Sequence, residues 1–140
     1  MNIRLANQDD LAVIYELTNQ LEETILDEDG FRKAFDDALN SDRICVLEEE
    51  GKVVAFIHFR VSSQLCRADD ILEIRELCVD ENCRSRGYGK ILLKKAEEYA
   101  EERGIRMIEI LSSLRRTRAH RFYEDNGYAI TGYRFFNEDK

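Results

Sequence analysis

The chain has 140 residues, 44% hydrophobic and 36% charged, a length and composition that suit one compact domain spanning residues 1–140. Its formal net charge of −8 argues against a general nucleic-acid binder and is compatible with a cationic partner such as an amine. No apolar run approaches the roughly 20 residues of a membrane span, and the first residues do not resemble a signal peptide, so we expect a cytoplasmic protein without a membrane segment. The four cysteines include no C-x-x-C pair, so we expect no metal site and reduced thiols, with Cys45 and Cys78 filling the core.

The first forty residues predict one strand and two helices. Residues 3–5 form a short apolar strand, and Asp9 or Asp10 would cap the helix that follows. Six apolar residues at helical spacing predict that helix: Leu11, Ile14, Tyr15, Leu17, Leu21 and Ile25. Residues 27–30 should end it, and a four-residue repeat then predicts a second short helix: Phe31, Phe35 and Leu39.

The middle of the chain predicts three strands. Residues 43–49 and 53–61 are rich in apolar side chains, and the Glu50-Gly51 turn between them indicates a hairpin. Residues 62–70 are polar and are expected to form a loop, after which residues 71–79 form the third strand.

The remainder predicts, in order, a helix, a strand, a basic loop, a short helix closed by glycine, and a final strand or hairpin: residues 89–103, 106–111, 112–118, 119–126 and 128–136. The element order is then β-α-α-β-β-β-α-β-α-β. This order indicates a mixed α/β (α+β) domain with a central sheet and a right-handed parallel crossover around the long helix.

The loop between the predicted strand 71–79 and the long helix carries the clearest chemical signal: Arg84-Ser85-Arg86-Gly87-Tyr88-Gly89. A helix N-terminus presents unpaired N–H groups and a partial positive charge, which together suit a phosphate group. Gly87 and Gly89 would let the backbone approach a ligand closely, and the two arginines add positive charge. The spacing matches neither a Walker loop nor a dinucleotide fingerprint, and a plain strand-to-helix turn is the alternative.

Three motifs in the same order and spacing resemble the GNAT superfamily of N-acetyltransferases over nearly the whole chain. The loop fits the pyrophosphate motif [QR]-x-x-G-x-[GA] of that family, and Leu77-Cys78-Val79 fits the L-x-V that ends its fourth strand. The downstream motif A-x-x-F-Y-x-x-x-G-[FY] matches residues 119–128. The resemblance implies acetyl-CoA as the donor, a fourth and a fifth strand that splay apart, and a GNAT-like fold.

The same resemblance assigns expected contacts to the donor. Pantetheine would bond to backbone along Leu77, Cys78 and Val79, and an N–H near Val79 would stabilise the developing oxyanion. The pyrophosphate would lie on amides of the loop and first helical turn: Arg84, Ser85, Arg86, Gly87, Tyr88, Gly89 and Lys90. Many members carry Asn where this chain has Arg116, so that contact departs from the family pattern. Arg116 and its neighbours would instead meet the 3′-phosphate or form a solvated turn.

Catalysis by direct attack of an amine needs a base for the ammonium and an acid for the CoA thiolate. The resemblance implies Tyr123 as the acid. Glu73 and Glu76 are the candidate bases, expected on opposite faces of their strand because strand side chains alternate. Each glutamate has an ion pair with Arg75 or another cation as its alternative role, and His120 is expected to lie at the surface.

These features predict an acetyl-CoA-dependent N-acetyltransferase that acts on a primary amine, either a small molecule or a protein amino group. No cysteine occupies the tyrosine position, so a covalent acetyl-enzyme is not expected. A non-catalytic acetyl-CoA-binding module is the alternative, since it would need the same glycines, and a homodimer is compatible with either function.

Overall fold

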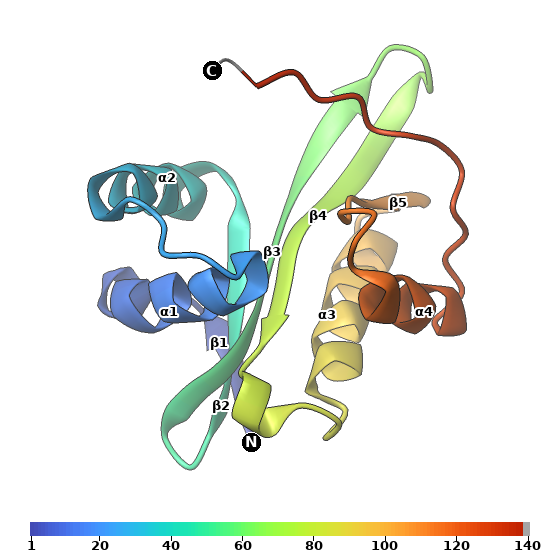
Figure 1. Cartoon of the computed structure of the whole chain (residues 1–140). Helices are drawn as coiled ribbons and strands as arrows, with labels where there is room; N and C mark the ends of the chain where they lie inside the picture. Colours follow the sequence, from blue (N-terminus) through green and yellow to red (C-terminus); the bar gives the residue numbers. More distant parts are fainter. Residues whose placement is uncertain (139–140) are drawn as a thin grey trace.

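The fold is built on a five-stranded sheet with helices on both faces (Figure 1), as seen in the computed structural model, which describes residues 1–138. The strands follow one another across the sheet in sequence order: β1 Asn2–Leu5, β2 Arg43–Glu49, β3 Lys52–Gln64, β4 Asp69–Val79 and β5 Met107–Ile110. The first four pair antiparallel, and β4 pairs parallel with β5. A parallel pair needs a crossover connection, and the third helix supplies it.

Two helices cover one face of the sheet and two cover the other (Figure 1). On one face lie α1, Leu11–Glu22, and α2, Glu28–Ser41. On the other lie α3, Tyr88–Glu102, and α4, Thr117–Asp125. Two single 3₁₀ turns, Gln8–Asp10 and Glu81–Cys83, precede α1 and follow β4. The prediction of a mixed sheet with helices on both faces is confirmed.

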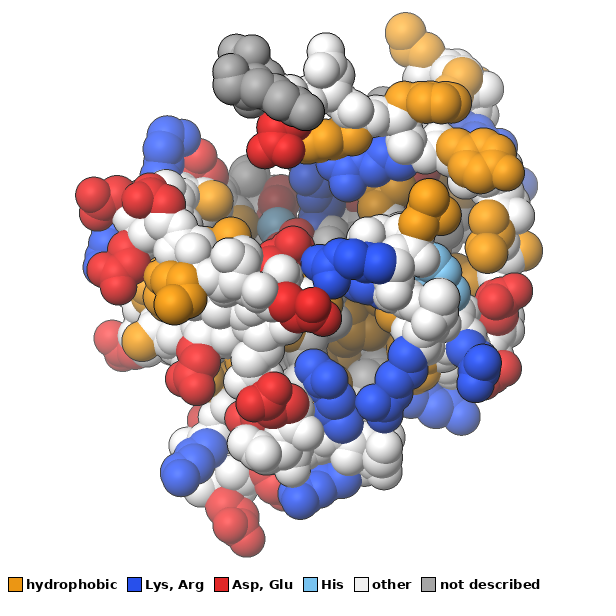
Figure 2. Space-filling model, viewed as in Figure 1, with side chains coloured by type: hydrophobic (Ala, Val, Ile, Leu, Met, Phe, Trp, Pro, Cys, Tyr) orange, Lys and Arg blue, Asp and Glu red, His pale blue; other side chains and the backbone are white. Residues whose placement is uncertain are grey.

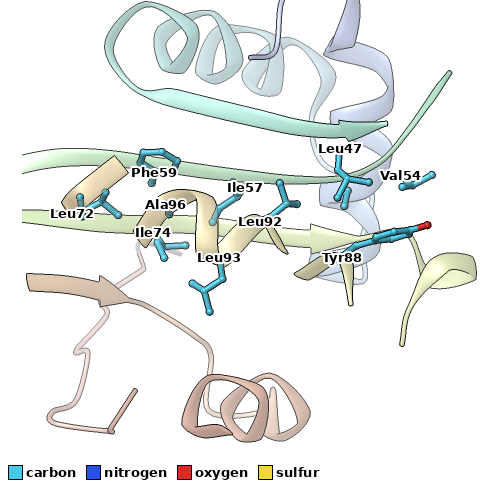
Figure 3. Close-up of a cluster of buried hydrophobic side chains, with 12 residues drawn as sticks. Leu47, Val54, Ile57, Phe59, Leu72, Ile74, Tyr88, Leu92, Leu93 and Ala96 are labelled. Carbon is cyan, nitrogen blue, oxygen red and sulfur yellow. The ribbon is translucent and has the colours of Figure 1, made fainter. Parts of the chain in front are cut away.

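The alternation of side chains along the strands gives each face of the sheet its own apolar core. The core under α3 contains the fully buried Leu47, Ile57 and Leu92 (Figure 3). The core under α1 and α2 contains Phe56 and Cys78, which confirms the core position predicted for that cysteine. Burial of each large apolar side chain contributes about 2 kcal/mol to the free energy of unfolding, so the two cores fix the sheet from both sides.

The first helical region begins where predicted but ends earlier. Asp10 is the N-cap of α1, as expected, although its side chain makes no hydrogen bond to that helix, and Asn7 caps the preceding 3₁₀ turn by accepting a hydrogen bond from the Asp9 N–H. Glu23 then takes a left-handed backbone with φ of 56° and ends α1, so Ile25 lies outside the helix and is exposed. Asp27 caps α2 through the Gly30 N–H, so residues 27–30 start a helix instead of breaking one.

The predicted loop at 62–70 is wrong, because the β3–β4 hairpin continues through most of it. Ser62 pairs with Ile71 and Ser63 with Asp70, which leaves only a tight turn at residues 65–68. This end of the hairpin is solvated, which suits polar residues, and the hydroxyls of the two serines bond to carboxylates on β4. Polarity therefore indicated exposure here and not a lack of strand structure.

The final strand or hairpin predicted at 128–136 is also wrong for the described chain. Gly127 has a φ of +93° and turns the backbone away from α4, after which residues 128–138 form no helix or strand. Ile130, Tyr133 and Phe135 are exposed. A strand needs a backbone partner and a packed face, and this segment has neither.

We searched residues 1–138 for a helix that could cross a lipid bilayer, and none combines the necessary length and apolar character.

Candidate active site

The central feature of the site is a gap between β4 and β5. The two strands pair only from Ile71 with Met107 to Ile74 with Ile110, and β4 continues beyond that point without a neighbour on this edge (Figure 1). A pocket occupies the gap and is lined from α1, β4, β5 and α4: Leu21, Ile74, Arg75, Glu76, Leu77, Ile110, Leu111, Ser112, Arg116, Ala119 and Tyr123. The predicted splaying of the fourth and fifth strands is therefore present.

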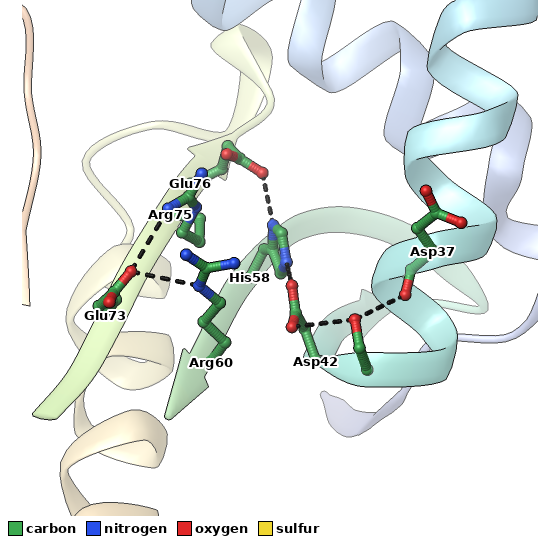
Figure 4. Close-up of polar contacts among 8 residues, drawn as sticks. Asp37, Asp42, His58, Arg60, Glu73, Arg75 and Glu76 are labelled. Carbon is green, nitrogen blue, oxygen red and sulfur yellow. Dashed lines mark hydrogen bonds and ion pairs between the residues drawn. The ribbon is translucent and has the colours of Figure 1, made fainter. Parts of the chain in front are cut away.

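A β-bulge at Arg75 marks the place where the strands part. On β3, His58 pairs with Glu76 and Phe59 with Ile74, which leaves Arg75 without a partner. One extra residue reverses the alternation of side chains along a strand. Glu73 bonds to Arg60, and Glu76 bonds to His58, two side chains on one face of β3 (Figure 4). The two glutamates therefore share a face, and the prediction that they lie on opposite faces is wrong.

Beyond the bulge, two residues of β4, Leu77 and Val79, have backbone groups that are not used in pairing with β3, although the Val79 carbonyl accepts from the Arg84 Nε at 3.4 Å. The Asp80 N–H donates to the Val54 carbonyl at 2.8 Å. Backbone groups point to alternate sides along an antiparallel ladder, so the N–H and C=O of Cys78, two residues earlier, also point toward β3. The N–H and C=O groups of Leu77 and Val79 then point toward the gap. The Cys78 side chain is buried under α1 and α2, so the contact predicted for Cys78 shifts to its two neighbours.

The loop that follows leaves the start of α3 with unpaired N–H groups that suit an anion. Gly87 is the N-cap with a φ of +83°, and it provides no side-chain hydrogen bond to the helix. The first intrahelical hydrogen bond runs from the Ile91 N–H to the Gly87 carbonyl at 3.1 Å. The N–H groups of Tyr88, Gly89 and Lys90 thus have no partner within the helix and are available to phosphate oxygens. Lys and Arg side chains gather over this end of the molecule (Figure 2).

The two glycines of the loop serve different purposes. Gly87 is needed for its backbone angle, since a Cβ there would meet nothing within 4 Å. A Cβ on Gly89 would lie 3.4 Å from the Phe122 ring of α4, at van der Waals contact, so α3 and α4 are already close at this position. Ser85 also has a positive φ, of 67°, a conformation that the motif did not indicate.

Tyr88 does not reach the phosphate region with its side chain. The ring is buried in the core beneath α3, and the hydroxyl donates to Glu49 at 2.6 Å. Only the Tyr88 backbone N–H remains for the donor contact predicted at this position.

Tyr123 on α4 lines the gap, as Glu76 on β4 does. Its ring packs edge-on against Phe122 and Tyr128, which fixes its orientation. Burial raises the pKa of the Tyr123 hydroxyl to about 12, with the buried Cys78 thiol adding to the effect and Arg116 opposing it. The hydroxyl is consequently protonated at neutral pH and can donate a proton into the gap.

The two candidate bases differ in their surroundings. Glu76 lines the gap, and its side chain is 35% exposed. Burial opposes ionisation of Glu73, but hydrogen bonds from Ser62 and Arg60 outweigh it and hold the Glu73 pKa below its ordinary value. Glu73 also contacts Arg75 and does not line the pocket. Both carboxylates therefore have a charged or chargeable partner, but Glu73 is paired with arginines outside the pocket lining, whereas Glu76, which contacts His58, lines the pocket.

The arginines within residues 115–118 contact two different parts of the molecule. Arg116 lines the gap and donates to Glu22 of α1 at 3.1 Å, while its Nε is buried without a partner among the described residues. Arg115 pairs with Glu23 in the same way. Arg118 donates to Ser85 in the phosphate loop. Of the arginines predicted to meet the 3′-phosphate, Arg118 contacts the proposed phosphate-binding loop, whereas Arg116 lines the gap.

His58 is a residue of the site that the sequence did not reveal. Its two ring nitrogens contact Glu76 and Asp42, each at 2.7 Å (Figure 4). An isolated histidine within a strand shows no pattern in sequence, and the pairing of β3 with β4 alone brings it beside Glu76. His120, by contrast, bonds to the Ser113 carbonyl outside the gap, as expected for a surface residue. In residues 1–138 we find no cluster of three side chains suited to a metal ion.

Comparison with known proteins decides the family. Residues 11–128 match the family described as Acetyltransferase (GNAT) family. The chain belongs to the GNAT acetyltransferase family. The match includes the phosphate loop and Tyr123, so the gap and the loop are features of a GNAT domain.

Relatives and solved GNAT structures agree with this assignment. The chain is 33% identical over 135 residues to the aminoalkylphosphonate N-acetyltransferase of Salmonella typhimurium, covering 95% of this chain and 88% of that one. The aminoglycoside N-acetyltransferase AAC(6')-Iy in complex with CoA superposes with a TM-score of 0.85 at 17% identity, over 99% of this chain and 94% of that chain. An acetyltransferase of Trypanosoma brucei gives a TM-score of 0.80 at 20% identity, over 98% of both chains. At these identities the two structures support the fold alone.

Proposed function

We propose that this GNAT domain transfers acetyl from acetyl-CoA to a primary amine by direct attack in a ternary complex, as a cytoplasmic enzyme. One observation carries the proposal: Tyr123 and Glu76 both line the gap, and the open N-terminus of α3 lies one loop beyond the end of β4. A protein that only bound acetyl-CoA would need the open helix end but not a hydroxyl and a carboxylate directed into the gap.

Binding of the donor is assigned to backbone groups. The free N–H groups at the start of α3 would hold the pyrophosphate, with Arg84 and Arg86 exposed beside them. Leu77 and Val79 would bond to the pantetheine amides in the manner of an added strand. The Val79 N–H also faces the region where the thioester oxygen would become negative.

The reaction requires one proton to be removed and one to be supplied. The acceptor arrives as an ammonium ion and must lose a proton before its nitrogen can attack, and Glu76 is assigned to accept that proton, directly or through one water. As the C–S bond breaks, Tyr123 donates its hydroxyl proton to the sulfur. Glu73 is assigned a supporting role, because its oxygens are occupied by Ser62 and two arginines.

The acceptor class is a small or protein-borne amine. The Salmonella relative is named for aminoalkylphosphonates, which makes an amine with a nearby anionic group one candidate. Arg75 and Arg116 line the gap and could meet such an anion. Polyamines, aminoglycosides and peptide amines are the other candidates, and the acidic character of the chain suits these cations.

The decisive experiment is a thiol-release assay with acetyl-CoA over a panel of these amines. Free CoA should appear only when both substrates are present, and mass spectrometry should find an acetylated amine. Thermal unfolding with acetyl-CoA, ATP and NAD provides the second measurement, with stabilisation expected from acetyl-CoA. Stabilisation without turnover on any amine would favour the binding module, and stabilisation by ATP or NAD alone would contradict the donor.

A further inference from the structure

His58 lies between two carboxylates that come from different parts of the fold. Its Nδ1 contacts Glu76 of β4 and its Nε2 contacts Asp42, which follows α2. The side chains of His58 and Asp42 are only 13% and 12% exposed, whereas that of Glu76 is 35% exposed. The three groups thus form a chain that begins inside the fold and ends at the gap (Figure 4).

The inner end of this chain is anchored on α2. The Asp42 N–H bonds to the Ala38 carbonyl at the end of the helix, and the Ser41 hydroxyl contacts both the Asp37 carbonyl and the Asp42 carboxylate (Figure 4). Asp42 therefore has a fixed position set by the helix terminus. The His58 imidazole contacts both Asp42 and Glu76, so it connects the end of α2 to β4.

The hydrogen bonds themselves define the charge of His58. An ionised carboxylate can only accept, so contacts at 2.7 Å on both ring nitrogens require an N–H on each, which is the imidazolium form. Burial disfavours the charge, but Glu76 and Asp42 together outweigh burial and raise the pKa of His58. Other charged groups drawn around this cluster are Arg60 and Arg75, both of which pair with Glu73 (Figure 4).

The alternative is that His58, Asp42 and Glu76 only stabilise the fold. Buried ion pairs are often no more stabilising than apolar side chains of the same size, so stability alone gives little reason for this arrangement. Its geometry has a clearer consequence at the gap, where one oxygen of the Glu76 carboxylate is held by His58. Without that contact, Glu76 would be free to turn toward the adjacent Arg75 guanidinium, which also lines the gap.

We propose that His58 and Asp42 are a pair of positioning residues that hold Glu76 in the orientation required of the general base. The proposal rests on the acetyltransferase function proposed above. His58 does not exchange its own protons with the substrate in this role. It acts through Glu76 alone, and Asp42 acts through His58.

A double-mutant cycle tests this order of action. His58→Gln removes the charge and one of the two donors, and it should lower kcat roughly 10-fold or more, as loss of an orienting partner commonly does, while the KM for acetyl-CoA stays the same. Glu76→Gln should lower kcat further, and adding His58→Gln to it should cause no additional loss. His120→Gln is the matched control and should retain wild-type kcat. Full activity in His58→Gln, or losses that multiply in the double variant, would overturn the proposal.

Nitrogen NMR of the imidazoles provides a test that needs neither turnover nor an altered fold. The chain has two histidines, so His120 is an internal reference. His58 should show both ring N–H groups at pH 7.5, and Asp42→Asn should lower its pKa. A neutral His58 with one ring N–H at that pH would overturn the proposal. Failure of acetyl-CoA to bind or react would instead contradict the proposed function and would leave this NMR result unaffected.

Discussion

At the scale of single residues, the proposed site rests on one hydroxyl and one carboxylate that line the same pocket, those of Tyr123 and Glu76. Tyr123 is held by ring packing, and no hydrogen bond to its hydroxyl occurs within residues 1–138. Glu76 has one oxygen on His58. Both groups therefore retain hydrogen-bonding capacity, and removing each one tests its proposed role.

Tyr123→Phe removes only the hydroxyl and should leave the fold unchanged. We expect kcat to fall about 100-fold, a typical contribution of a general acid, with little change in the KM for acetyl-CoA. Steady-state thiol release measures both constants. Tyr128→Phe is the control: its hydroxyl bonds to Glu97, so this variant should lose about 1 kcal/mol of stability and keep its kcat. Equal turnover in Tyr123→Phe and the wild type would eliminate the acid role.

Glu76→Gln and Glu73→Gln separate the two candidate bases. Glu76→Gln should reduce kcat by about two orders of magnitude, since an amide cannot accept the ammonium proton. Glu73→Gln should reduce it only a few-fold, because Glu73 is enclosed by Ser62 and arginines away from the gap. The same assay, run from pH 6 to 9, measures the effect. A larger loss in Glu73→Gln would reverse the assignment.

At the scale of helices and strands, sequence periodicity predicted the order of the elements from β1 to α4, but not their ends and not the irregular segment after α4. The helix at 89–103 and the strands around it were predictable because apolar spacing and flanking glycines agree there. The bulge at Arg75 was not, since it arises from the pairing of β4 with β3 and has no signature in β4 itself. For the same reason the common face of Glu73 and Glu76, and the contact with His58, could not be read from one strand alone.

The phosphate loop was predictable because its requirement is local: a left-handed residue before an open helix end. Gly87→Ala tests this. Both Gly87 and Gly104 have a positive φ, of +83° and +68°, with open space around a new Cβ, so alanine at either should cost about 1 kcal/mol of unfolding free energy. Only Gly87→Ala should also raise the Kd for acetyl-CoA, measured by calorimetry. If Gly87→Ala and Gly104→Ala had the same stability and the same Kd for acetyl-CoA, the loop would not be a binding site for the donor.

At the scale of the whole molecule, one buried ion pair connects the edge of the sheet to the first helix. Arg4 on β1 makes two hydrogen bonds to Asp10, at 2.8 and 2.9 Å, and a third to Glu48 on β2. The Asp10 side chain is only 6% exposed and also accepts from the Asn7 N–H. This link positions α1, whose far end carries Leu21 to the gap.

Because Arg4 donates to it, Asp10 has a pKa below its ordinary value, although burial opposes the shift. A carboxylate whose pKa is lowered by folding stabilises the protein fully above its unfolded pKa, near 4, and loses that contribution as the pH falls through the folded value. Asp10→Asn should therefore lower the unfolding free energy by about 2 kcal/mol at pH 7, and the difference from wild type should shrink as the pH falls below about 4.

Urea unfolding at a series of pH values measures this difference. Asp37→Asn is the control, because Asp37 pairs with Lys33 at the surface, where both side chains are more than half exposed. Such a pair contributes little, so Asp37→Asn should change stability by less than about 0.5 kcal/mol at any pH. A loss in Asp10→Asn that stayed constant down to pH 3 would show that packing, and not the charge of Asp10, holds the first helix to the sheet.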